Sequence, residues 1–435
     1  MLDTALANAT QKLEGKDLFL VPEPEILDHT NLVRPAKLVF MAQGVKVEIP
    51  LPSEDRKLVD LLGILRELFA DPSRLVIGWE IKNVLSYVQC RTGRKFIPAG
   101  TILDLKVLEG FMGIKDACPK TFHDAKTRLA FVATQPTWKE LKELYKKVYL
   151  PLITEVVPSM EANKLAHRGE HILLSSFYEI AAQTNGRMKC HKALTRCYNP
   201  HSITEDDKNN LFPTRYETKF LYLDFKHMEV SVLGWLTNDP VLGEILASGS
   251  DLYSSIWKKL TTIDADAAQR QKCKDVFLPI VFGLGVEGVA EKLKVSGATA
   301  GKLVDRVYLI FSVAMDWIKR RQNSLDENNY AYDFFGKRRR FEEQLYRIRN
   351  FQVQSPAALV CLHKLVRLHE ALATDEGKLA YHVHDGYMVI ADRNTWQKTT
   401  QLAKQVLESE EDMYSGLKLK VACSIGDTMA VMKSI

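Results

Sequence analysis

The sequence predicts an α+β protein, and three observations about the order of its apolar patterns support this prediction. Short strand-like runs come first, with a helical pattern between the second and third of them. A block of helical patterns, from about residue 239 to 325, then interrupts a second set of strand-like runs. A hairpin pattern and a last strand follow this block. Strands divided by a large helical insertion favour an α+β fold over a doubly wound sheet.

The first 135 residues have the pattern of a small α/β unit. Apolar runs predict strands at residues 37–42, 46–51 and 74–79, and helical spacing of apolar residues predicts a helix over 55–70. A long helical pattern over 137–157 leads out of this unit. Beyond it, the predicted elements are a strand at 220–225, a helix at 350–373, a hairpin at 381–391, a helix at 393–409 and a strand at 417–425.

Bulk properties set only broad limits on function. At 435 residues the chain is long enough for two or three domains, and its formal charge of +5 is compatible with a polyanionic partner. No apolar run approaches the roughly 18 residues of a membrane span, and the polar start is unlike a signal peptide. Seven scattered cysteines suggest free thiols in a reducing compartment. We therefore expect a soluble, cytoplasmic or intracellular protein without a membrane partner.

One cluster contains residue types that ligate zinc, namely Cys190, His191, Cys197 and His201. Its spacing lacks the tight Cys-x2-Cys knuckle of structural zinc sites. Ordinary loop residues are therefore favoured over a structural metal at this position.

Two aspartates far apart in the chain, Asp224 and Asp385, each end a short apolar run. Two carboxylates can hold two divalent metal ions about 3.5–4 Å apart, as in-line nucleotidyl transfer requires. Each feature is ambiguous alone: Asp224 can be a surface residue, Glu229 a helix-start residue that satisfies the dipole, and Asp385–Gly386 a tight turn. With a basic helix between the two aspartates, they favour a template-directed nucleic-acid polymerase.

That basic helix carries Arg270, Lys274, Leu278 and Phe282 at steps of four residues, each of which advances about 400°. These side chains therefore share one face, which is basic for a triphosphate at one end and apolar for a base pair at the other. An amphipathic helix with a solvated basic end would give the same pattern. We expect a kink at Pro279, because proline removes a hydrogen bond and clashes with the carbonyl four residues earlier.

The order of these segments resembles that of family A, DNA polymerase I-like DNA polymerases, over roughly residues 171–435. Each motif is weak alone, but six motifs in the family's order are hard to obtain by chance. The resemblance implies a right-hand polymerase fold with a palm and fingers. It rests on TNGR (184–187), LDFKHMEV (223–230), RQKCKDVFLPIVFG (270–283), FFGKRRRF (334–341), RNFQVQSPAA (349–358) and VHD (383–385).

The resemblance also implies the roles of single residues at the reacting centre. Asp224 and Asp385 would bind two Mg²⁺ ions, for which Mn²⁺ could substitute, and the carbonyl of Phe225 could be a further ligand. Arg270 and Lys274 would contact the triphosphate, and Lys274 would protonate the departing pyrophosphate.

Other residues would contact the remainder of the substrates by the same resemblance. Glu229 would exclude a ribose 2′-hydroxyl and so favour dNTPs. Tyr253, Leu278 and Phe282 would lie at the nucleotide. Primer–template DNA would be contacted by Arg187, Asn350, Gln354 and His384, with the basic run Arg338, Arg339 and Arg340 as phosphate-binding candidates.

The first 135 residues resemble, more faintly, the RNase H-like 3′–5′ exonuclease domain of the same family. Residues 76–93 look like its G-x-N-x-K-x-D stretch, and residues 102–112 look like its D-T-x-x-x-S-Y-L stretch. Val84 stands where an aspartate should follow the lysine, and Asp104 alone cannot hold two metal ions. The resemblance therefore implies an exonuclease-like domain that does not proofread.

The sequence departs from the family pattern in two further ways. Residues 151–163 run almost directly into residues 171–187, which leaves too few residues for the family's long helical thumb. Loss of the thumb should cost grip on the duplex, so synthesis is distributive or a processivity or replisome partner supplies the grip. In the site itself, Gly386 replaces the glutamate of the usual His-Asp-Glu.

We therefore expect an exonuclease-like domain at 1–135, a helical connection or thumb remnant at 136–170, palm at 171–238 and 346–435, and fingers at 239–345. The expected activity is DNA-templated addition of dNTPs to a primer 3′-hydroxyl. Two alternatives stay open. A phage-type RNA polymerase shares the motif order, although Glu229 argues against it. A non-catalytic DNA-binding or replisome scaffold would explain the missing thumb, but not the retention of both aspartates and both cations.

Overall fold

The chain forms two compact units. The first unit comprises Met1–Asp224, Cys361–Leu407 and Val421–Ile435, and the second comprises Phe225–Val360 and Glu408–Lys420. The computed structural model describes residues 13, 16–25, 34–51, 55–92, 94, 101–114, 117–135, 137–163, 165–167, 172–174, 178–180, 187–190, 200–213, 217–342, 345–372 and 377–435.

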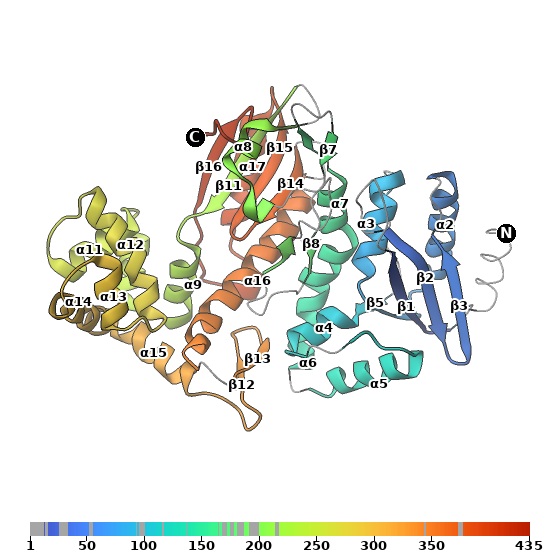
Figure 1. The fold of residues 1–435 in the computed structure, drawn as a ribbon, viewed down its shortest axis with the longest axis horizontal. Helices are drawn as coiled ribbons and strands as arrows, with labels where there is room; N and C mark the ends of the chain where they lie inside the picture. Colours follow the sequence, from blue (N-terminus) through green and yellow to red (C-terminus); the bar gives the residue numbers. More distant parts are fainter. Residues whose placement is uncertain are drawn as a thin grey trace. The chain divides into compact units, whose positions relative to one another are not determined.

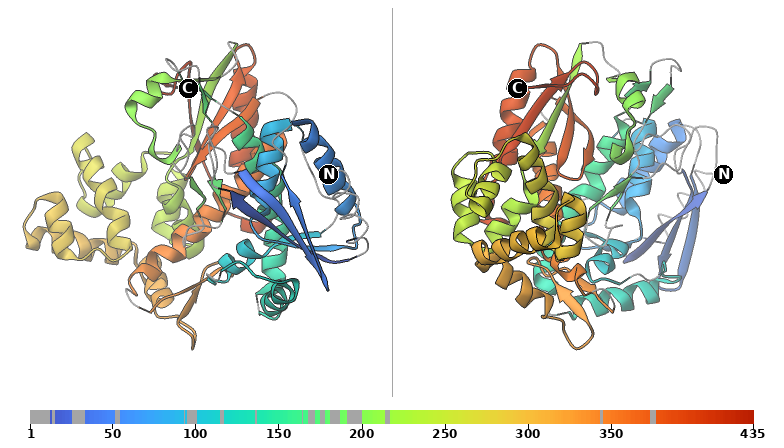
Figure 2. Two further views of the ribbon diagram at one scale, coloured as in Figure 1. Left: turned by 45° about the vertical axis from the view of Figure 1, so that its right-hand side comes forward. Right: turned by 60° about the vertical axis from the view of Figure 1, so that its left-hand side comes forward.

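The N-terminal part of the first unit is built on a mixed five-stranded sheet of order β3-β2-β1-β4-β5 (Figures 1 and 2). β1 (Leu18–Glu25), β2 (Arg34–Ala42) and β3 (Val45–Pro50) form its antiparallel half. β4 (Leu75–Gly78) and β5 (Thr101–Asp104) extend it in parallel. The three expected strands are confirmed.

The sequence did not reveal β1, because Pro22 and Pro24 interrupt its apolar pattern. Proline is tolerated in a strand only at edges or irregularities, and here the pairing of β1 with β2 shifts register between Glu23 and Pro24. Helices α2 (Asp55–Leu68) and α3 (Ile81–Thr92) connect the strands, and α2 matches the expected helix.

A long helical run links this sheet to the second sheet of the first unit. It follows α4 (Leu105–Phe111) and α5 (Phe122–Ala133) and consists of α6 (Trp138–Leu144), two π-helical stretches at Tyr145–Tyr149 and Leu152–Val156, and α7 (Val157–Ala162). α7 packs on α3 and on β14. Just beyond it, the Asn163 side chain donates to the Leu379 carbonyl at 2.7 Å.

The second sheet of the first unit has the order β14-β15-β11-β16-β17, so β11 lies at its centre (Figure 1). Its strands are β11 (Thr218–Phe225), β14 (Gly377–Val383), β15 (Gly386–Asp392), β16 (Val421–Gly426) and β17 (Lys433–Ser434). These elements confirm the predicted strand at 220–225, the hairpin and the last strand.

Two helices accompany this second sheet. The later part of α16 (Arg347–Leu372) is tied to it by the Tyr387 hydroxyl, which donates to the Cys361 carbonyl at 2.8 Å. Lys364 on the same helix donates to the Val406 carbonyl of α17 (Trp396–Glu408) at 3.0 Å.

Short elements occupy the described residues between Asn163 and Glu217. α8 is the one α-helix among them, with a capping box formed by Thr204 and Asp207. The segments are β6 (Leu165–His167), β7 (Ile172–Leu174), β8 (Tyr178–Glu179), β9 (Lys189–Cys190), the 3-10 turn Pro200–Ser202, α8 (Glu205–Asn210) and β10 (Leu211–Pro213).

The second unit is mainly helical, as the block from 239 to 325 predicts. Aspartate or serine caps four of its helices, namely Asp239, Asp251, Asp266 and Ser296, as expected for these residue types at helix starts. A small hairpin precedes α16. The elements are α9 (Met228–Thr237), α10 (Pro240–Ala247), α11 (Leu252–Thr261), α12 (Ala267–Val281), α13 (Val286–Leu293), α14 (Gly297–Ile310), α15 (Ser312–Gln322), β12 (Tyr330–Tyr332) and β13 (Arg338–Arg340).

The predicted α+β class is therefore confirmed, with two sheets in the first unit and a helical second unit. Within the part of the chain that the structure describes, none of the helices combines the length and the apolar character that a membrane crossing needs.

Candidate active site

Asp224 lies near the end of β11, the central strand of the second sheet. Alternate residues of this strand, including Leu221, Leu223 and Phe225, are buried, while Tyr222 and Asp224 point to the opposite face and are partly exposed. The apolar residues therefore hold the strand in the sheet, and the carboxylate is left accessible at its end.

Asp385 lies at the tip of the β14–β15 hairpin, as expected, but the turn differs from the predicted one. Val383 pairs with Gly386, so His384 and Asp385 are the two turn residues and Gly386 already belongs to β15. The positive φ of 55° that the turn requires is found at His384. The expectation of an Asp385–Gly386 turn is wrong by one residue, because strand pairing extends to Gly386.

The strand register brings the two carboxylates to the same end of the sheet. In the antiparallel pairing of β11 with β15, Asp224 lies opposite Gly386, the neighbour of Asp385. Burial raises the pKa of the Tyr222 hydroxyl, and the negative charges of Asp224 and Asp385 raise it further. Tyr222 therefore stays protonated at neutral pH and can donate a hydrogen bond.

Arg187 contributes positive charge to this end of the sheet. Burial raises the pKa of Asp385 above its usual range, and the guanidinium of Arg187 opposes that shift. Burial and the same charge lower the pKa of His384. Arg187 was expected to touch duplex DNA, and it lies close enough to the carboxylate to influence its ionisation. Thr184 and Gly186 of the same motif lie outside the described residues.

Neighbouring aromatic and imidazole groups hold the base of the hairpin. The Tyr178 hydroxyl donates to the His382 carbonyl at 2.8 Å and accepts from the His382 amide at 2.9 Å. The rings of His201 and His384 lie 5.0 Å apart, and burial lowers the pKa of His201 to about 4. These imidazoles are therefore neutral at physiological pH and shape the site by packing.

The second unit contains the cationic helix that the sequence predicts. α12 starts with a capping box of Asp266 and Gln269 and runs through Pro279 as one helix. Its core face consists of Cys273, Val276, Phe277, Ile280 and Val281.

The four residues predicted to share a face avoid that core. Arg270, Leu278 and Phe282 are partly exposed, and Lys274 is exposed. Phe282 is the C-cap of α12 rather than a residue within it, because the helix ends at Val281 and Gly283 follows with a positive φ of 104°.

Arg270 is oriented by Asp251, the N-cap of α11, and by Tyr253 in the first turn of that helix. Its Nε and Nη2 atoms bind the two carboxylate oxygens of Asp251 at 2.9 Å each. The guanidinium also lies 6.0 Å from the centre of the Tyr253 ring. Sequence reasoning missed Asp251, although an aspartate directly before an apolar helical run is a typical N-cap, and it does cap α11 by accepting from Ser254.

Glu229 and Tyr253 belong to the same cluster in the second unit. Glu229 lies in the first turn of α9, where it was expected. Burial, followed by the charges of Cys273 and Glu229, raises the pKa of Tyr253 to about 12. The His227 ring meets the Tyr253 ring edge-on at 5.2 Å. His227 itself has a left-handed φ of 57°, which makes the abrupt change from β11 to α9 possible.

Two further predicted contacts lie one turn apart on α16. Asn350 and Gln354 are both partly exposed, and their spacing puts them on one face of the helix. The amide oxygen of Asn350 has no hydrogen-bond partner among the described residues, although water has no access to it. Gln352, between them, is buried and donates to the Tyr332 carbonyl at 3.0 Å, so it has a structural role.

The run of three arginines forms β13 and is not a uniformly solvated face. Arg338 stacks on Tyr330 at 4.4 Å, and Arg339 packs on Phe341 at 4.8 Å. Arg340 is exposed and forms an ion pair with Glu342 at 3.1 Å. These guanidinium planes are held against aromatic rings, which pre-organises two of the three cations.

A family assignment follows from comparison with known proteins. The model of DNA polymerase family A matches residues 126–431, which is most of the chain. The chain belongs to DNA polymerase family A.

Individual members of this family are distant relatives. Thermostable DNA polymerase I of Thermus aquaticus is 22% identical over 219 residues, which are 47% of this chain and 26% of the relative. DNA polymerase theta of Drosophila melanogaster is 22% identical over 251 residues, covering 52% and 12%. The DNA polymerase of Mycobacterium phage D29 is 27% identical over 177 residues, covering 40% and 29%. The chain thus spans less than a third of the length of each of these relatives.

A solved structure shows the same fold. The POL domain of Pol1 from M. smegmatis, in complex with DNA primer–template and dNTP, superposes with a TM-score of 0.73 at 13% sequence identity. The match covers 98% of each chain, so it includes the N-terminal domain. The expectation of an α+β family A polymerase fold is confirmed.

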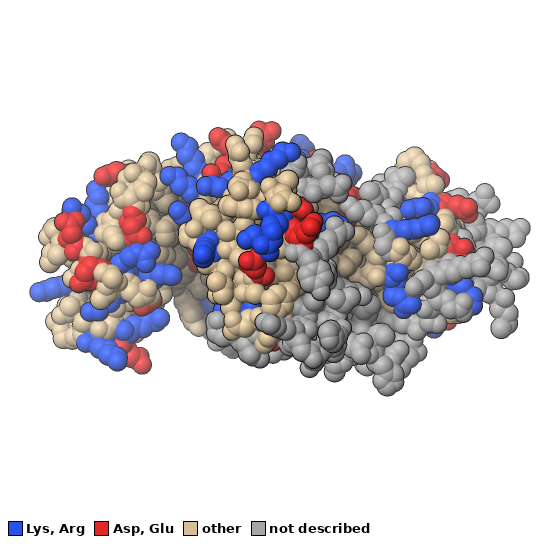
Figure 3. Space-filling model, turned by 90° about the horizontal axis from the view of Figure 1, so that it is seen from above, with Lys and Arg blue, Asp and Glu red and all other residues tan. Residues whose placement is uncertain are grey.

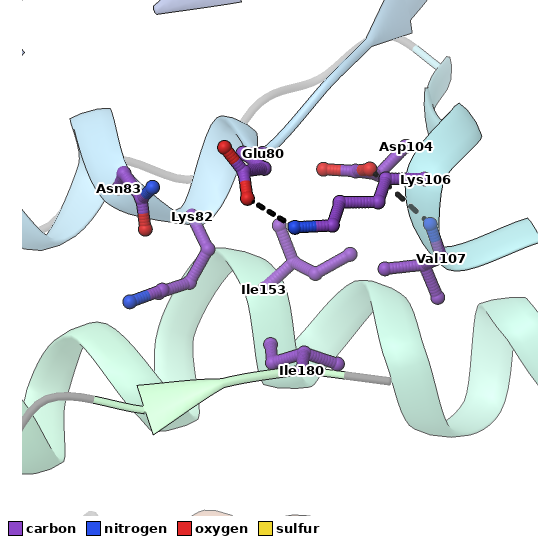
Figure 4. A pocket seen from close by; sticks show the side chains of 8 residues that line it. All are labelled: Glu80, Lys82, Asn83, Asp104, Lys106, Val107, Ile153 and Ile180. Carbon is purple, nitrogen blue, oxygen red and sulfur yellow. Dashed lines mark hydrogen bonds and ion pairs between the residues drawn. The ribbon is translucent and has the colours of Figure 1, made fainter. Parts of the chain in front are cut away.

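In the N-terminal domain, Asp104 and Glu80 are engaged in structural contacts (Figure 4). Asp104 is buried, caps α4 and accepts from the Ile81 amide at 3.0 Å, and burial raises its pKa to about 6. Glu80 is paired with Lys106. The cavity lined by these residues has a volume of about 30 Å³, which admits about one or two water molecules and no nucleotide.

The lysine of the same exonuclease-like stretch is also engaged. Lys82 is buried and forms an ion pair with Glu161 of α7, with N–O distances of 3.0 and 3.3 Å. Glu161 in turn accepts from the Tyr178 amide at 2.6 Å. This network joins α7, at the end of the helical run, to α3 and β8.

The candidate zinc cluster is only partly described. Cys190 lies in β9 and His201 in the 3-10 turn, whereas His191 and Cys197 fall outside the described residues. Among described side chains, no group of three His, Cys, Asp or Glu residues has a metal-binding arrangement.

The face seen in Figure 3 carries charges of both signs. There, Lys and Arg side chains are interspersed with Asp and Glu side chains over the described surface. The small net charge of +5 fits this mixture. The described surface on this face therefore carries no extended region of one charge sign.

The Asp251–Arg270 pair predicts an abnormal acid titration. Burial opposes ionisation of Asp251, but the Arg270 guanidinium and the Ser254 amide outweigh it and lower its pKa to about 2. Because the folded pKa lies below the unfolded one, the pair's contribution to stability should be full above about pH 4 and should disappear as the pH falls towards 2. Carboxyl-carbon NMR titration should give a midpoint near pH 2, and Arg270→Ala should raise it.

Lys258→Ala is the matched control. Lys258 lies on α11, the helix that Asp251 caps, but it pairs with Asp264 instead. The Asp251 midpoint should stay unchanged in that variant. An unchanged midpoint in Arg270→Ala would contradict the assignment of the shift to this ion pair.

Proposed function

We propose that this chain is a DNA-templated DNA polymerase that adds deoxynucleotides to a primer 3′-hydroxyl and releases pyrophosphate. The main support is the pairing of β11 with β15, in which Asp224 lies opposite Gly386, next to Asp385. Membership of family A supports the same activity, as does the primer–template and dNTP bound to the M. smegmatis domain of the same fold.

Asp224 and Asp385 are the proposed metal ligands. Their hard carboxylate oxygens suit Mg²⁺, which proteins usually bind through one or two carboxylates together with substrate phosphates and water. The carbonyl of Phe225, directly after Asp224, is a further candidate, and Mn²⁺ could substitute. When bound, two such ions would lower the pKa of the primer hydroxyl and neutralise charge on the phosphates.

Arg270 and Lys274 are the proposed triphosphate-binding residues. The clamp on Asp251 keeps the Arg270 guanidinium ordered, so less conformational entropy is lost when it meets a phosphate. Lys274, exposed one turn later, could donate the proton that pyrophosphate needs as it leaves. Leu278 and Phe282 continue this face and are proposed to contact the nucleotide and its base pair.

Glu229 and Tyr253 are proposed to select the sugar. They lie in one cluster with Arg270, and Glu229 influences the ionisation of the Tyr253 hydroxyl. A carboxylate fixed beside the sugar would leave no room for a 2′-hydroxyl, which favours dNTPs over rNTPs. This arrangement supports a DNA polymerase over a phage-type RNA polymerase.

Several residues are proposed to contact primer–template DNA. The amide side chains of Asn350 and Gln354 are partly exposed on one face of α16 and suit the reading of base edges. Cationic and imidazole groups would contact the backbone and the primer end, namely Arg187, His384, Arg338, Arg339 and Arg340.

We further propose that this polymerase lacks proofreading. The carboxylate of Asp104 is engaged by backbone amides, and Lys106 and Lys82 neutralise the neighbouring acids Glu80 and Glu161. A second metal site of the two-carboxylate type would need free acids. The N-terminal domain therefore serves as a structural element.

Low processivity is the last part of the proposal. Between Asn163 and Glu217 the described residues form short strands, a 3-10 turn and the six-residue helix α8, and none of them belongs to a long helix. Weak grip on the duplex backbone should shorten each synthesis run, unless a processivity or replisome partner compensates.

Primer extension with Mg²⁺ and dNTPs tests the proposed polymerase activity. The native chain should extend a labelled primer, and Asp224→Ala or Asp385→Ala should abolish detectable extension because the metal ligands are lost. Lys274→Ala should slow extension about 10²–10³-fold, as removal of one stabilising donor does elsewhere.

Excess trap DNA tests the proposed low processivity. The native chain should then give short products for each binding event, and long products from the chain alone would contradict low processivity.

Lys272→Ala is the matched control on α12, since Lys272 is exposed but lies off the Arg270–Lys274 face. It should change the rate by less than about twofold, as surface substitutions usually do. Retained extension in a folded Asp385→Ala variant would rule out the proposed metal site. Failure of the native chain, with its fold intact, would favour a non-catalytic DNA-binding scaffold.

Sugar discrimination gives an independent prediction. The native chain should prefer dNTPs, and Glu229→Ala should raise the relative incorporation of rNTPs by about tenfold or more, because space opens for the 2′-hydroxyl. Single-nucleotide incorporation kinetics with matched dNTP and rNTP pairs would measure this ratio. A native preference for rNTPs would point instead to an RNA polymerase.

Absence of proofreading predicts a stable primer terminus. Without dNTPs, a labelled primer with a mismatched 3′ end should keep its length in the presence of Mg²⁺. Asp104→Ala should leave this result unchanged but reduce the free energy of unfolding by about 1–2 kcal/mol, because it removes a helix cap. Shortening by the native chain that disappears in Asp104→Ala would show a working exonuclease.

A further inference from the structure

The surroundings of Gly386 leave no room for a side chain, whereas its backbone conformation does not require glycine. The positive φ of the hairpin turn belongs to His384, and Gly386 lies in the regular pairing of β15. A Cβ atom at this position would lie 2.1 Å from the Oη atom and 2.6 Å from the Cζ atom of Tyr222. Any side chain at residue 386 would therefore overlap the tyrosine ring.

Tyr222 reaches this position along its own strand. Tyr222 and Asp224 are two residues apart on β11, so both side chains leave the same face of the sheet. The ring extends over Gly386 towards the strand end, and its hydroxyl donates to the Oδ1 atom of Asp224 at 3.4 Å, the long end of hydrogen-bond distances. Tyr222 thus contacts one proposed metal ligand and covers the residue next to the other.

Gly386 stands where the family pattern has the glutamate of His-Asp-Glu, and the ring of Tyr222 occupies the space in which that side chain would start. Tyrosine and glycine are complementary here, because the ring fits only if residue 386 has no side chain. The two residues therefore form a unit, which we call the Tyr222–Gly386 pair.

We infer that Tyr222 is a positioning residue of the proposed metal site, where its ring fills the space above Gly386 and its hydroxyl orients the Asp224 carboxylate. This inference rests on the proposed assignment of Asp224 and Asp385 as metal ligands. Groups that hydrogen-bond to a ligating carboxylate orient it, and their loss typically weakens metal affinity or activity by about 10–100-fold. Tyr222 touches neither substrate nor reacting atoms in this role.

Direct Mn²⁺ binding tests the hydroxyl without relying on catalysis. Electron paramagnetic resonance of Mn²⁺ should report its affinity for the full chain bound to primer–template, with Asp224→Ala as the baseline. Tyr222→Phe keeps the ring and removes only the hydroxyl, so it should weaken Mn²⁺ binding about tenfold. The same variant should raise the Mg²⁺ concentration for half-maximal extension and leave the KM for dNTP unchanged.

Tyr381→Phe is the matched control. Tyr381 is a tyrosine of the same sheet, more buried than Tyr222, and its hydroxyl donates to the Met429 sulfur at 3.5 Å. It should bind Mn²⁺ like the native chain. If Tyr222→Phe binds Mn²⁺ as Tyr381→Phe does, the role of the hydroxyl is refuted.

A double-mutant cycle tests the Tyr222–Gly386 pair itself. Gly386→Ala should weaken Mn²⁺ binding, because the new methyl group displaces the ring. In a Tyr222→Ala background the same substitution should have no further effect, since the obstacle is gone. Independent, multiplicative losses from the two substitutions would overturn the inference.

Recovery of Mn²⁺ binding in a double variant is the strictest test of the Tyr222–Gly386 pair. Gly386→Glu alone should weaken Mn²⁺ binding more than Gly386→Ala, whereas Tyr222→Ala with Gly386→Glu should recover binding because the carboxylate enters the vacated space. Equal weakening in both backgrounds would contradict the pairing. If the native chain binds Mn²⁺ at Asp224 but does not extend primers, the polymerase proposal fails while these binding measurements still decide the role of Tyr222.

Discussion

The antiparallel pairing of β11 with β15 is the constraint on which the candidate site depends. It sets Asp224 opposite Gly386 and thereby brings the carboxylates of two distant chain segments to one end of a sheet. A slip of one residue would turn Asp224 to the opposite face, because side chains alternate along a strand. Burial of Leu221, Leu223 and Phe225 prevents that slip. The apolar face of the strand therefore determines the position of its polar chemistry.

The cationic part of the site is organised by a different interaction. Arg270 could adopt many rotamers on an exposed helix, but Asp251 and Tyr253 restrict it from the neighbouring helix. Asp251 caps α11 and binds Arg270 with the same carboxylate, so one side chain both starts a helix and orients a cation. Pre-organisation of this kind is where electrostatic stabilisation in polymerases would be expected to arise.

In the N-terminal domain, two buried acidic groups have structural roles. Asp104 caps α4, and Lys82 forms a buried ion pair with Glu161 of α7. Breaking such a pair leaves an uncompensated buried charge, so these residues are constrained by stability. The helical run that carries Glu161 also reaches β14 through Asn163, which ties the domain to the second sheet.

The sequence by itself determined the α+β class, most strands and helices, and the candidate residues, because apolar periodicity and motif order are local properties of the chain. It could not determine β1, whose prolines disguise a strand that β2 and β4 stabilise. It misplaced the hairpin turn by one residue, since pairing with β11 and β14 extends β15 to Gly386. Asp251 and Tyr222 acquired their roles only in three dimensions. Their partners, Arg270 and Gly386, lie on other elements of the fold, and only tertiary packing brings those atoms together.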